Sequence, residues 1–87
     1  MEITDKRLFD EVADVIMDNV CVSKDQVKPE TNLIDDLSCE PLDVAMLVVE
    51  LEAKFSVSIS DEELERTNYN VGEIYVCIMN KKKGEVK

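Results

Sequence analysis

The chain has 87 residues, of which 20 are acidic, 10 are basic and none is histidine, so its formal net charge is -10. A surface this acidic repels nucleic acid and anionic membranes, and it favours partner proteins that carry basic patches. Without histidine the chain has no imidazole for acid–base catalysis or metal binding, and Cys21, Cys39 and Cys77 form no CxxC pair typical of a zinc site.

The first expected element is an amphipathic helix over residues 5–20. Thr4 is the predicted N-cap, because its hydroxyl can accept a hydrogen bond from a free backbone N–H. Apolar side chains recur at helical spacing along one side, and acidic side chains occupy the opposite side. The apolar set is Leu8, Phe9, Val12, Val15, Ile16 and Val20.

A long connection follows over residues 21–39, because Pro29 and its polar neighbours interrupt any helical pattern. A short turn is possible near residues 24–27. Loops of this length are uncommon unless they pack or have a function. We therefore expect its apolar side chains to hold it against the bundle; these are Val27, Leu33, Ile34 and Leu37.

The next helix is predicted over residues 41–55. Pro41 suits the first helical position, where a missing backbone N–H is no loss. Glu40 places a negative charge at the positive end of the helix dipole. One face of this helix has the larger apolar side chains and is the expected core face, with Val44, Leu47, Val48, Leu51 and Phe55.

A second apolar face lies on the opposite side of the same helix, with Leu42, Ala45, Met46, Val49 and Ala53. Two explanations of this face are open at this point. Either the long connection covers it, or it is exposed and binds a partner protein. In the second case the flexible thioether of Met46 would suit contacts with different partners.

Two more helices are predicted after a connection in which Ile59 points inward. Ser60 and Glu63 form a capping box that opens a short helix ending near Arg66. A similar capping signal, Asn70 with Glu73, opens a last helix. The apolar set of this helix is Val71, Ile74, Tyr75 and Ile78.

We expect one domain over residues 1–80 and a basic, flexible tail over 81–87.

Four segments together resemble a known family: Asp36-Leu37-Ser38, Glu40-Pro41-Leu42, the run from Leu47 to Phe55, and Ile59-Ser60-Asp61-Glu62-Glu63. They are similar to the acyl carrier proteins, and the resemblance covers nearly the whole chain. It implies an all-α four-helix bundle with a long first loop and a short third helix. It also implies a role in fatty acid or polyketide-type metabolism, with synthase enzymes as partners. The residues themselves predict that the chain is not an enzyme, because it has no histidine and its carboxylates are spread along solvated helices without an acid–base pair.

The chain departs from this family at Pro41. Acyl carrier proteins have at the matching position a serine that bears a phosphopantetheine arm, and proline has no side-chain oxygen for the phosphodiester. We therefore expect no cofactor, unless a non-standard residue is modified. Ser38 is the weak alternative attachment site, at a position where the family has glycine. Cys39 is a second alternative, as a direct thioester, although Asp36 and Glu40 are expected to raise its pKa.

The predicted function is therefore a protein–protein interaction or scaffold module that lacks the arm; the alternative is a carrier modified at Ser38. We expect a cytoplasmic monomer that binds neither nucleic acid nor membrane. Asp35 and Asp36 lack the spacing of a calcium loop, so no metal site is predicted. The expected partner-binding residues are Glu40, Leu42, Asp43, Ala45, Met46, Val49, Glu52 and Ala53.

Overall fold

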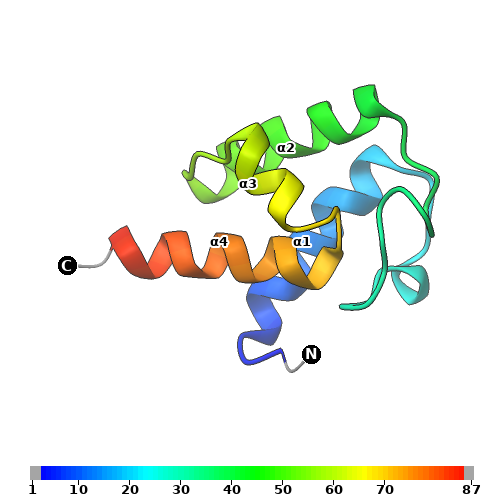
Figure 1. Cartoon of the computed structure of the whole chain (residues 1–87). Coiled ribbons are helices and arrows are strands. Elements are labelled where there is room, and N and C mark those ends of the chain that lie inside the picture. The colour runs from blue at the N-terminus through cyan, green and yellow to red at the C-terminus, as the bar shows by residue number, and fades with distance from the viewer. Residues whose placement is uncertain (1–2, 86–87) are drawn as a thin grey trace.

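The computed structural model describes residues 3–85 as an all-α bundle, which confirms the predicted fold class. Its helices are α1 (Lys6–Asn19), α2 (Pro41–Phe55), α3 (Asp61–Arg66) and α4 (Val71–Glu85), with a 3-10 turn η1 (Lys24–Gln26) in the long connection. Helix α1 packs against both α2 and α4, and the connection between α1 and α2 folds over one end of the bundle (Figure 1). The predicted bounds of α2 and α3 are confirmed.

Helix α1 begins one residue later than expected, and its N-cap is Asp5 instead of Thr4. The Asp5 carboxylate accepts a hydrogen bond from the Leu8 backbone N–H at 3.0 Å. Aspartate ranks above threonine as an N-cap, and Asp5 lies three residues before Leu8, where its oxygen reaches the free N–H. The Thr4 hydroxyl lies 3.7 Å from the Met79 sulfur.

The core lies between α1, α2 and α4 and contains the apolar sets predicted for these helices; Val20 and Val48 are only partly buried. Phe9 and Tyr75 meet edge to face, with ring centroids 5.7 Å apart. Tyr75 is fully buried, and its hydroxyl accepts a hydrogen bond from the Asp5 backbone N–H at 2.8 Å. This bond satisfies a polar group in the core and ties the start of α1 to α4.

The long connection is held to the bundle by buried side chains and by backbone hydrogen bonds. Val27 and Leu33 are buried and Leu37 is partly buried, as expected. The prediction for Ile34 is wrong, because its side chain is 39% exposed. Ile34 belongs to a turn whose N–H groups at residues 34 and 35 both donate to the Asn32 Oδ1, and this turn directs its side chain outward.

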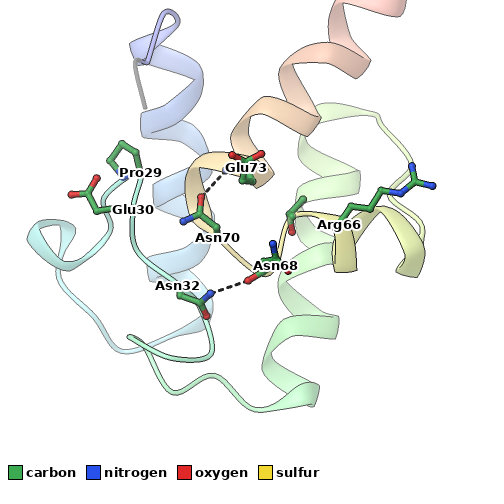
Figure 2. Close-up of a pocket in the computed structure, with 8 residues that line it drawn as sticks. Pro29, Glu30, Asn32, Arg66, Asn68, Asn70 and Glu73 are labelled. Atoms are coloured by element: carbon green, nitrogen blue, oxygen red, sulfur yellow. Dashed lines mark hydrogen bonds between the residues drawn. The ribbon is translucent and has the colours of Figure 1, made fainter.

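The same connection is fastened to the turn between α3 and α4. The Leu33 N–H donates to the Tyr69 carbonyl at 2.8 Å, and the Val71 N–H donates to the Thr31 carbonyl at 2.9 Å. Between them, the Asn32 side-chain amide donates to the Asn68 carbonyl at 2.8 Å (Figure 2). These bonds border a polar pocket of about 540 Å³ that Pro29, Glu30, Asn32, Arg66, Thr67, Asn68, Asn70 and Glu73 line.

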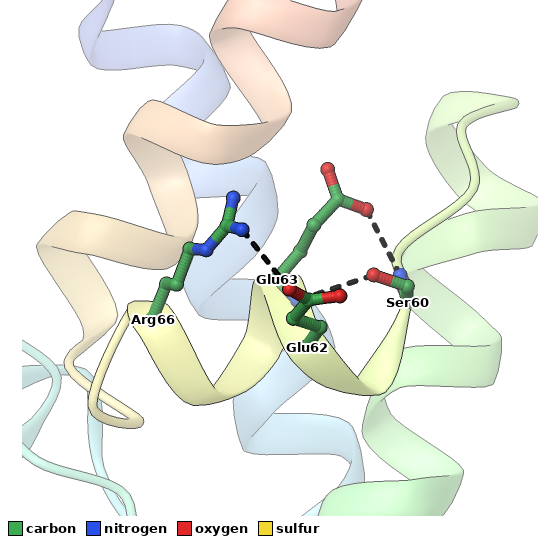
Figure 3. A network of polar contacts seen from close by, with 4 residues as sticks. All are labelled: Ser60, Glu62, Glu63 and Arg66. Carbon is green, nitrogen blue, oxygen red and sulfur yellow. Dashed lines mark hydrogen bonds and ion pairs between the residues drawn. The ribbon is translucent and has the colours of Figure 1, made fainter.

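Helix α3 starts with the predicted capping box. The Glu63 carboxylate accepts from the Ser60 N–H at 3.0 Å, and the Ser60 hydroxyl accepts from the Glu63 N–H at 3.1 Å (Figure 3). At the start of α4 the Asn70 side chain accepts from the Glu73 N–H at 2.9 Å. The Asn70 backbone N–H donates to the Thr67 carbonyl instead of the Glu73 carboxylate, so the second box is only half formed.

Helix α4 continues through Glu85, so residues 81–85 are helical in the segment where fraying is expected. The Lys81 amino group lies 2.6 Å from the Glu63 carboxylate, and the Lys82 amino group lies 5.9 Å from the centre of the Phe55 ring. Lysine is also a good helix former. The rest of the predicted tail, residues 86 and 87, lies outside the described residues. The division into a domain over 1–80 and a tail over 81–87 stays a prediction.

Candidate docking face and attachment position on α2

Helix α2 starts at a hydrogen-bonded corner where Pro41 is exposed to solvent. The Glu40 N–H donates to the Asp43 carboxylate at 3.0 Å, and the Val44 N–H donates to the Glu40 carbonyl at 3.1 Å. Pro41 is the first helical residue and is exposed. A side chain at this position is accessible to a modifying enzyme, but the Pro41 ring contains no oxygen or sulfur atom that could form an ester.

Ser38 lies three residues earlier and is also exposed. Its φ is 54°, in the left-handed region where a Cβ atom crowds the backbone and where glycine is favoured. Its backbone N–H donates to the Ile34 carbonyl at 3.2 Å, which keeps the residue in the turn instead of in the helix. The Ser38 hydroxyl is therefore accessible, but it lies in a turn and not at the helix start.

Cys39, the second alternative attachment residue, is buried, with 7% of its surface exposed. Its backbone N–H donates to the Leu33 carbonyl at 2.9 Å. Burial is the main cause that raises the pKa of the Cys39 thiol, and the charge of Asp43 raises it further. The expected causes were Asp36 and Glu40, so that assignment is wrong. A thiol held protonated and covered by neighbours is a poor nucleophile.

The second apolar face of α2 is exposed, so the explanation that the long connection covers it is wrong. Leu42 is 70% exposed, Met46 is 55% exposed and Val49 is 64% exposed. Ala45 and Ala53 are exposed on the same face. The opposite face provides the core residues Val44, Leu47, Leu51 and Phe55.

Two hollows flank this exposed face. One has a volume of about 440 Å³ and lies toward the end of α1; it is lined by Asn19, Ala45, Met46, Val49, Glu50 and Ala53. The other has a volume of about 430 Å³ and lies toward α3; it is lined by Ile34, Pro41, Val44, Ala45, Asp61, Leu64 and Tyr69. Ala45 lines both, so the apolar surface continues across α2.

The acidic residues predicted for this face have different roles in the structure. Asp43 and Glu52 are partly buried and bonded to backbone groups, since the Glu52 carboxylate accepts from the Ile59 N–H at 2.8 Å. Glu40 and Glu50 are exposed. Glu50 and Asn19 line the hollow toward α1 but were not among the residues predicted from the sequence, since helical spacing within α2 does not show which end of α1 lies beside it.

Comparison with known proteins agrees with this architecture. Residues 10–77 match the family described as "Phosphopantetheine attachment site". The chain is 42% identical over 64 residues to an acyl carrier protein of Chlorobium phaeovibrioides, an alignment that spans 74% of this chain and 82% of that protein. This chain belongs to the acyl carrier protein family. Members of that family are carriers and not enzymes, which confirms the expectation that the chain is not an enzyme.

Other acyl carrier proteins are also similar to this chain. The protein of Campylobacter fetus is 48% identical over 59 residues, which are 68% of this chain and 77% of that protein. The solved structure of the acyl carrier protein from Enterococcus faecalis superposes with a TM-score of 0.74 at 32% identity, covering 91% of this chain and 99% of that one. Phosphopantetheine attachment is typical of the family, so the start of α2 in this acyl carrier protein relative is the position to test.

Residues 3–85 provide no group of three or more cysteine, aspartate or glutamate side chains placed to hold a metal ion. The Asp36 carboxylate accepts from the Asn32 N–H at 2.7 Å, which gives it a structural role in the turn. None of the described helices has both the length and the apolar character needed to cross a membrane.

Proposed function

We propose that this chain is an acyl carrier protein relative that has no phosphopantetheine arm and acts as a docking or scaffold protein for enzymes of acyl metabolism. The observation that carries the proposal is the combination at α2 of Pro41, which offers no side-chain oxygen, with an exposed apolar face beside it. The fold that presents the attachment position is present, and the atom that would form the ester is missing. What remains for function is the surface.

The partners in this proposal are proteins with basic patches, such as acyl-chain synthase enzymes in the cytoplasm. Glu40 and Glu50 are exposed on α2, and the chain as a whole has a net charge of -10. Such a field increases the rate of encounter with cationic surfaces. The apolar residues between these charges add a contact that buries hydrophobic surface, which favours a longer-lived complex.

The test is intact-mass measurement of the full chain after incubation with a phosphopantetheinyl transferase and coenzyme A. We expect no mass increase for the natural sequence. The matched control is Pro41→Ser, which restores a hydroxyl at the exposed first position of α2 and is expected to gain one arm. If Pro41→Ser gains the arm and the natural chain does not, the side chain at position 41 alone explains why the natural chain is not modified. An arm on the natural chain contradicts the proposal.

A carrier modified at Ser38 is the second candidate, because the Ser38 hydroxyl is exposed three residues before Pro41. The same measurement distinguishes the two. An adduct on the natural chain that disappears in Ser38→Ala would assign the arm to Ser38. The left-handed backbone of Ser38 and its position in a turn argue against recognition by an enzyme that reads a helix start.

A further inference from the structure

We propose that the last turns of α4, residues 78–85, form a clasp that holds α3 closed, and that α3 opens as a unit beside the Cys77 thiol when the clasp is released. These turns lie beyond the family match, which ends at residue 77. Two lysines of the clasp, Lys81 and Lys82, contact other helices. The device is therefore built from a part of this chain that the family match does not include.

Helix α3 buries little of its surface. It has six residues, and none of them is buried; Leu64 is partly buried against the core. The contacts of α1 with α2 and with α4 are each more extensive than any that α3 makes with another helix. Short segments with few buried apolar contacts are the ones that open locally while the rest of a protein stays folded.

Both ends of α3 are fixed to the bundle. Before the helix, Ile59 is buried and its N–H donates to the Glu52 carboxylate at 2.8 Å. After the helix, Thr67 is buried, and the Tyr69 carbonyl accepts from the Leu33 N–H at 2.8 Å. The helix between these two anchors can therefore open without unfastening either of them.

One polar contact joins α3 to another helix in the described part of the chain, and it comes from the clasp. The Lys81 amino group lies 2.6 Å from the Glu63 carboxylate. The other hydrogen bonds and ion pairs of α3 stay within residues 60–68, so they shape the helix without holding it to the bundle (Figure 3). Lys82 lies over the Phe55 ring, so the clasp contacts both α3 and the end of α2.

Cys77 lies where the opening of α3 would expose it. A hollow of about 200 Å³ between α3 and α4 is lined by Glu63, Arg66, Thr67, Glu73, Val76 and Cys77. The Cys77 side chain is partly buried. Burial is the main cause that raises the pKa of its thiol, and the charge of Glu63 raises it further. The reactivity of this thiol therefore reports whether α3 is closed or open.

Opening of α3 also changes the surface beside the attachment position. Asp61 and Leu64 of α3 form one side of the hollow of about 430 Å³, and Pro41 and Ala45 are among the α2 residues on its other side. When α3 moves, this hollow loses its α3 side, whereas the hollow toward α1 keeps all of its lining. The clasp thus controls one of the two hollows that flank the exposed face of α2.

The experiment measures the rate at which each cysteine of the full, natively folded chain reacts with iodoacetamide, by mass mapping of the peptides. Cys21 is exposed, Cys77 is partly buried and Cys39 is buried in the core. We expect Cys77 to react more slowly than Cys21, at a rate that depends little on urea, because a local opening exposes little surface. Cys39 should react more slowly still, at a rate that rises steeply with urea.

Lys81→Met removes the contact between the clasp and α3 and should speed the labelling of Cys77 about three- to fivefold, the effect of losing a partly exposed ion pair. Loss of the Lys81 charge by itself would raise the pKa of Cys77 and slow its reaction, so faster labelling reports opening. Lys81→Arg keeps a charged donor for Glu63 and should label like the natural chain.

Ile16→Val is the matched control, because it removes one methylene group from a fully buried residue of α1 and destabilises the whole fold by a comparable amount. It should leave the labelling rate of Cys77 unchanged, since the packing of α1 is kept when α3 alone opens. Hydrogen exchange gives a second measurement. The Leu64 amide, which donates to the Ser60 carbonyl, should exchange faster in Lys81→Met by the same factor as Cys77 labelling.

The proposal is overturned if Cys77 of the natural chain reacts as fast as Cys21, because no closed state would then protect it. It is also overturned if Lys81→Met leaves the Cys77 rate unchanged. A Cys77 rate that rises with urea as steeply as that of Cys39, or that increases as much in Ile16→Val as in Lys81→Met, would show that exposure needs unfolding of the whole chain. The mass experiment on position 41 is independent of all these results.

Discussion

The Lys81 amino group of α4 lies 2.6 Å from the carboxylate of Glu63 in α3, with the two side chains 26% and 35% exposed. The pair joins α3, the shortest α-helix of the described residues, to the second half of α4. Two hydrogen bonds to the Glu63 carboxylate lower its pKa from 4.5 to about 2. The bond from Lys81 has the larger effect, and the bond from the Ser60 backbone N–H has the smaller one. The same contact raises the pKa of Lys81 above its ordinary value.

These shifts predict the pH dependence of stability. A carboxyl group with a lowered pKa stabilises the folded chain fully above its unfolded pKa of 4.5, and this contribution is lost as the pH falls toward about 2. The Lys81 contribution is present below 10.5 and is lost as the pH rises through the raised pKa. Glu63→Gln should therefore lower the Tm at pH 7, and the difference from the natural chain should vanish at the acid end of a thermal melting series.

Glu63→Gln tests the charge of Glu63 alone, since glutamine at this position can still accept a hydrogen bond from the Ser60 N–H and keep the capping box. Glu62→Gln, one residue earlier, is the control. Glu62 pairs with Arg66 at 3.1 Å, but both side chains are about three-quarters exposed, at 77% and 74% (Figure 3). Exposed pairs contribute little, so Glu62→Gln should melt close to the natural chain at every pH. Equal losses in both variants would contradict a special role for Lys81.

A second prediction concerns the fastening of the long connection to the turn between α3 and α4. Asn32→Ala removes the bond to the Asn68 carbonyl and the side-chain acceptor of the Ile34 and Asp35 N–H groups. We expect a loss of about 1–2 kcal/mol in the free energy of unfolding, because several polar groups lose their partners. Hydrogen exchange should become faster at the Leu33 amide, which bonds across the same contact.

Asn80→Ala provides the comparison for this experiment. Asn80 is an exposed residue within α4, and alanine is a better helix former than asparagine, so this variant should be as stable as the natural chain or slightly more stable. If Asn32→Ala is equally harmless in denaturant unfolding, the connection is held by its buried residues Val27 and Leu33 alone.

The sequence predicted what depends on neighbours along one helix. The start of α2 follows from Pro41 and its core face from the spacing of Val44, Leu47, Leu51 and Phe55. The outer face could be recognised because it is apolar on a helix that already has a core face, although two explanations stayed open until the exposure of Met46 and Val49 was known. Its role as a binding surface stays a prediction.

What the sequence could not predict are contacts between segments distant in the chain. Glu63 was recognised as a capping residue, but nothing in its neighbourhood shows that Lys81, 18 positions later, supplies the second bond. The tail was therefore predicted to fray, although two of its lysines contact Glu63 and Phe55. Likewise, an asparagine in a polar loop is ordinary, and only the fold brings Asn32 to Asn68.

A third prediction follows from the left-handed conformation of Ser38, whose φ is 54°. Glycine adopts this conformation without crowding at Cβ, so Ser38→Gly should stabilise the chain by about 0.5–1 kcal/mol, after allowing for the greater freedom of glycine in the unfolded state. Ser58→Gly is the control, because Ser58 is exposed in the α2–α3 connection and is not among the residues with positive φ. It should be neutral or destabilising in urea unfolding; a stabilisation equal to that of Ser38→Gly would remove backbone strain as the explanation.

The two faces of α2 lead to the last prediction. Leu51 is 1% exposed and Phe55 is 5% exposed, so replacing either by alanine leaves a cavity and should cost roughly 2–5 kcal/mol. Met46 is 55% exposed on the opposite face, so Met46→Lys should change the free energy of unfolding by no more than about 0.5 kcal/mol. The same lysine places a positive charge on the exposed apolar face of α2 and should weaken binding of a partner protein that has a basic patch. Urea unfolding of the three variants measures the first effect, and affinity capture of acyl-chain synthase enzymes with the natural chain and with Met46→Lys measures the second. A destabilised Met46→Lys would place this side chain in the core, whereas a stable variant that still captures the same partner would remove Met46 from the docking surface.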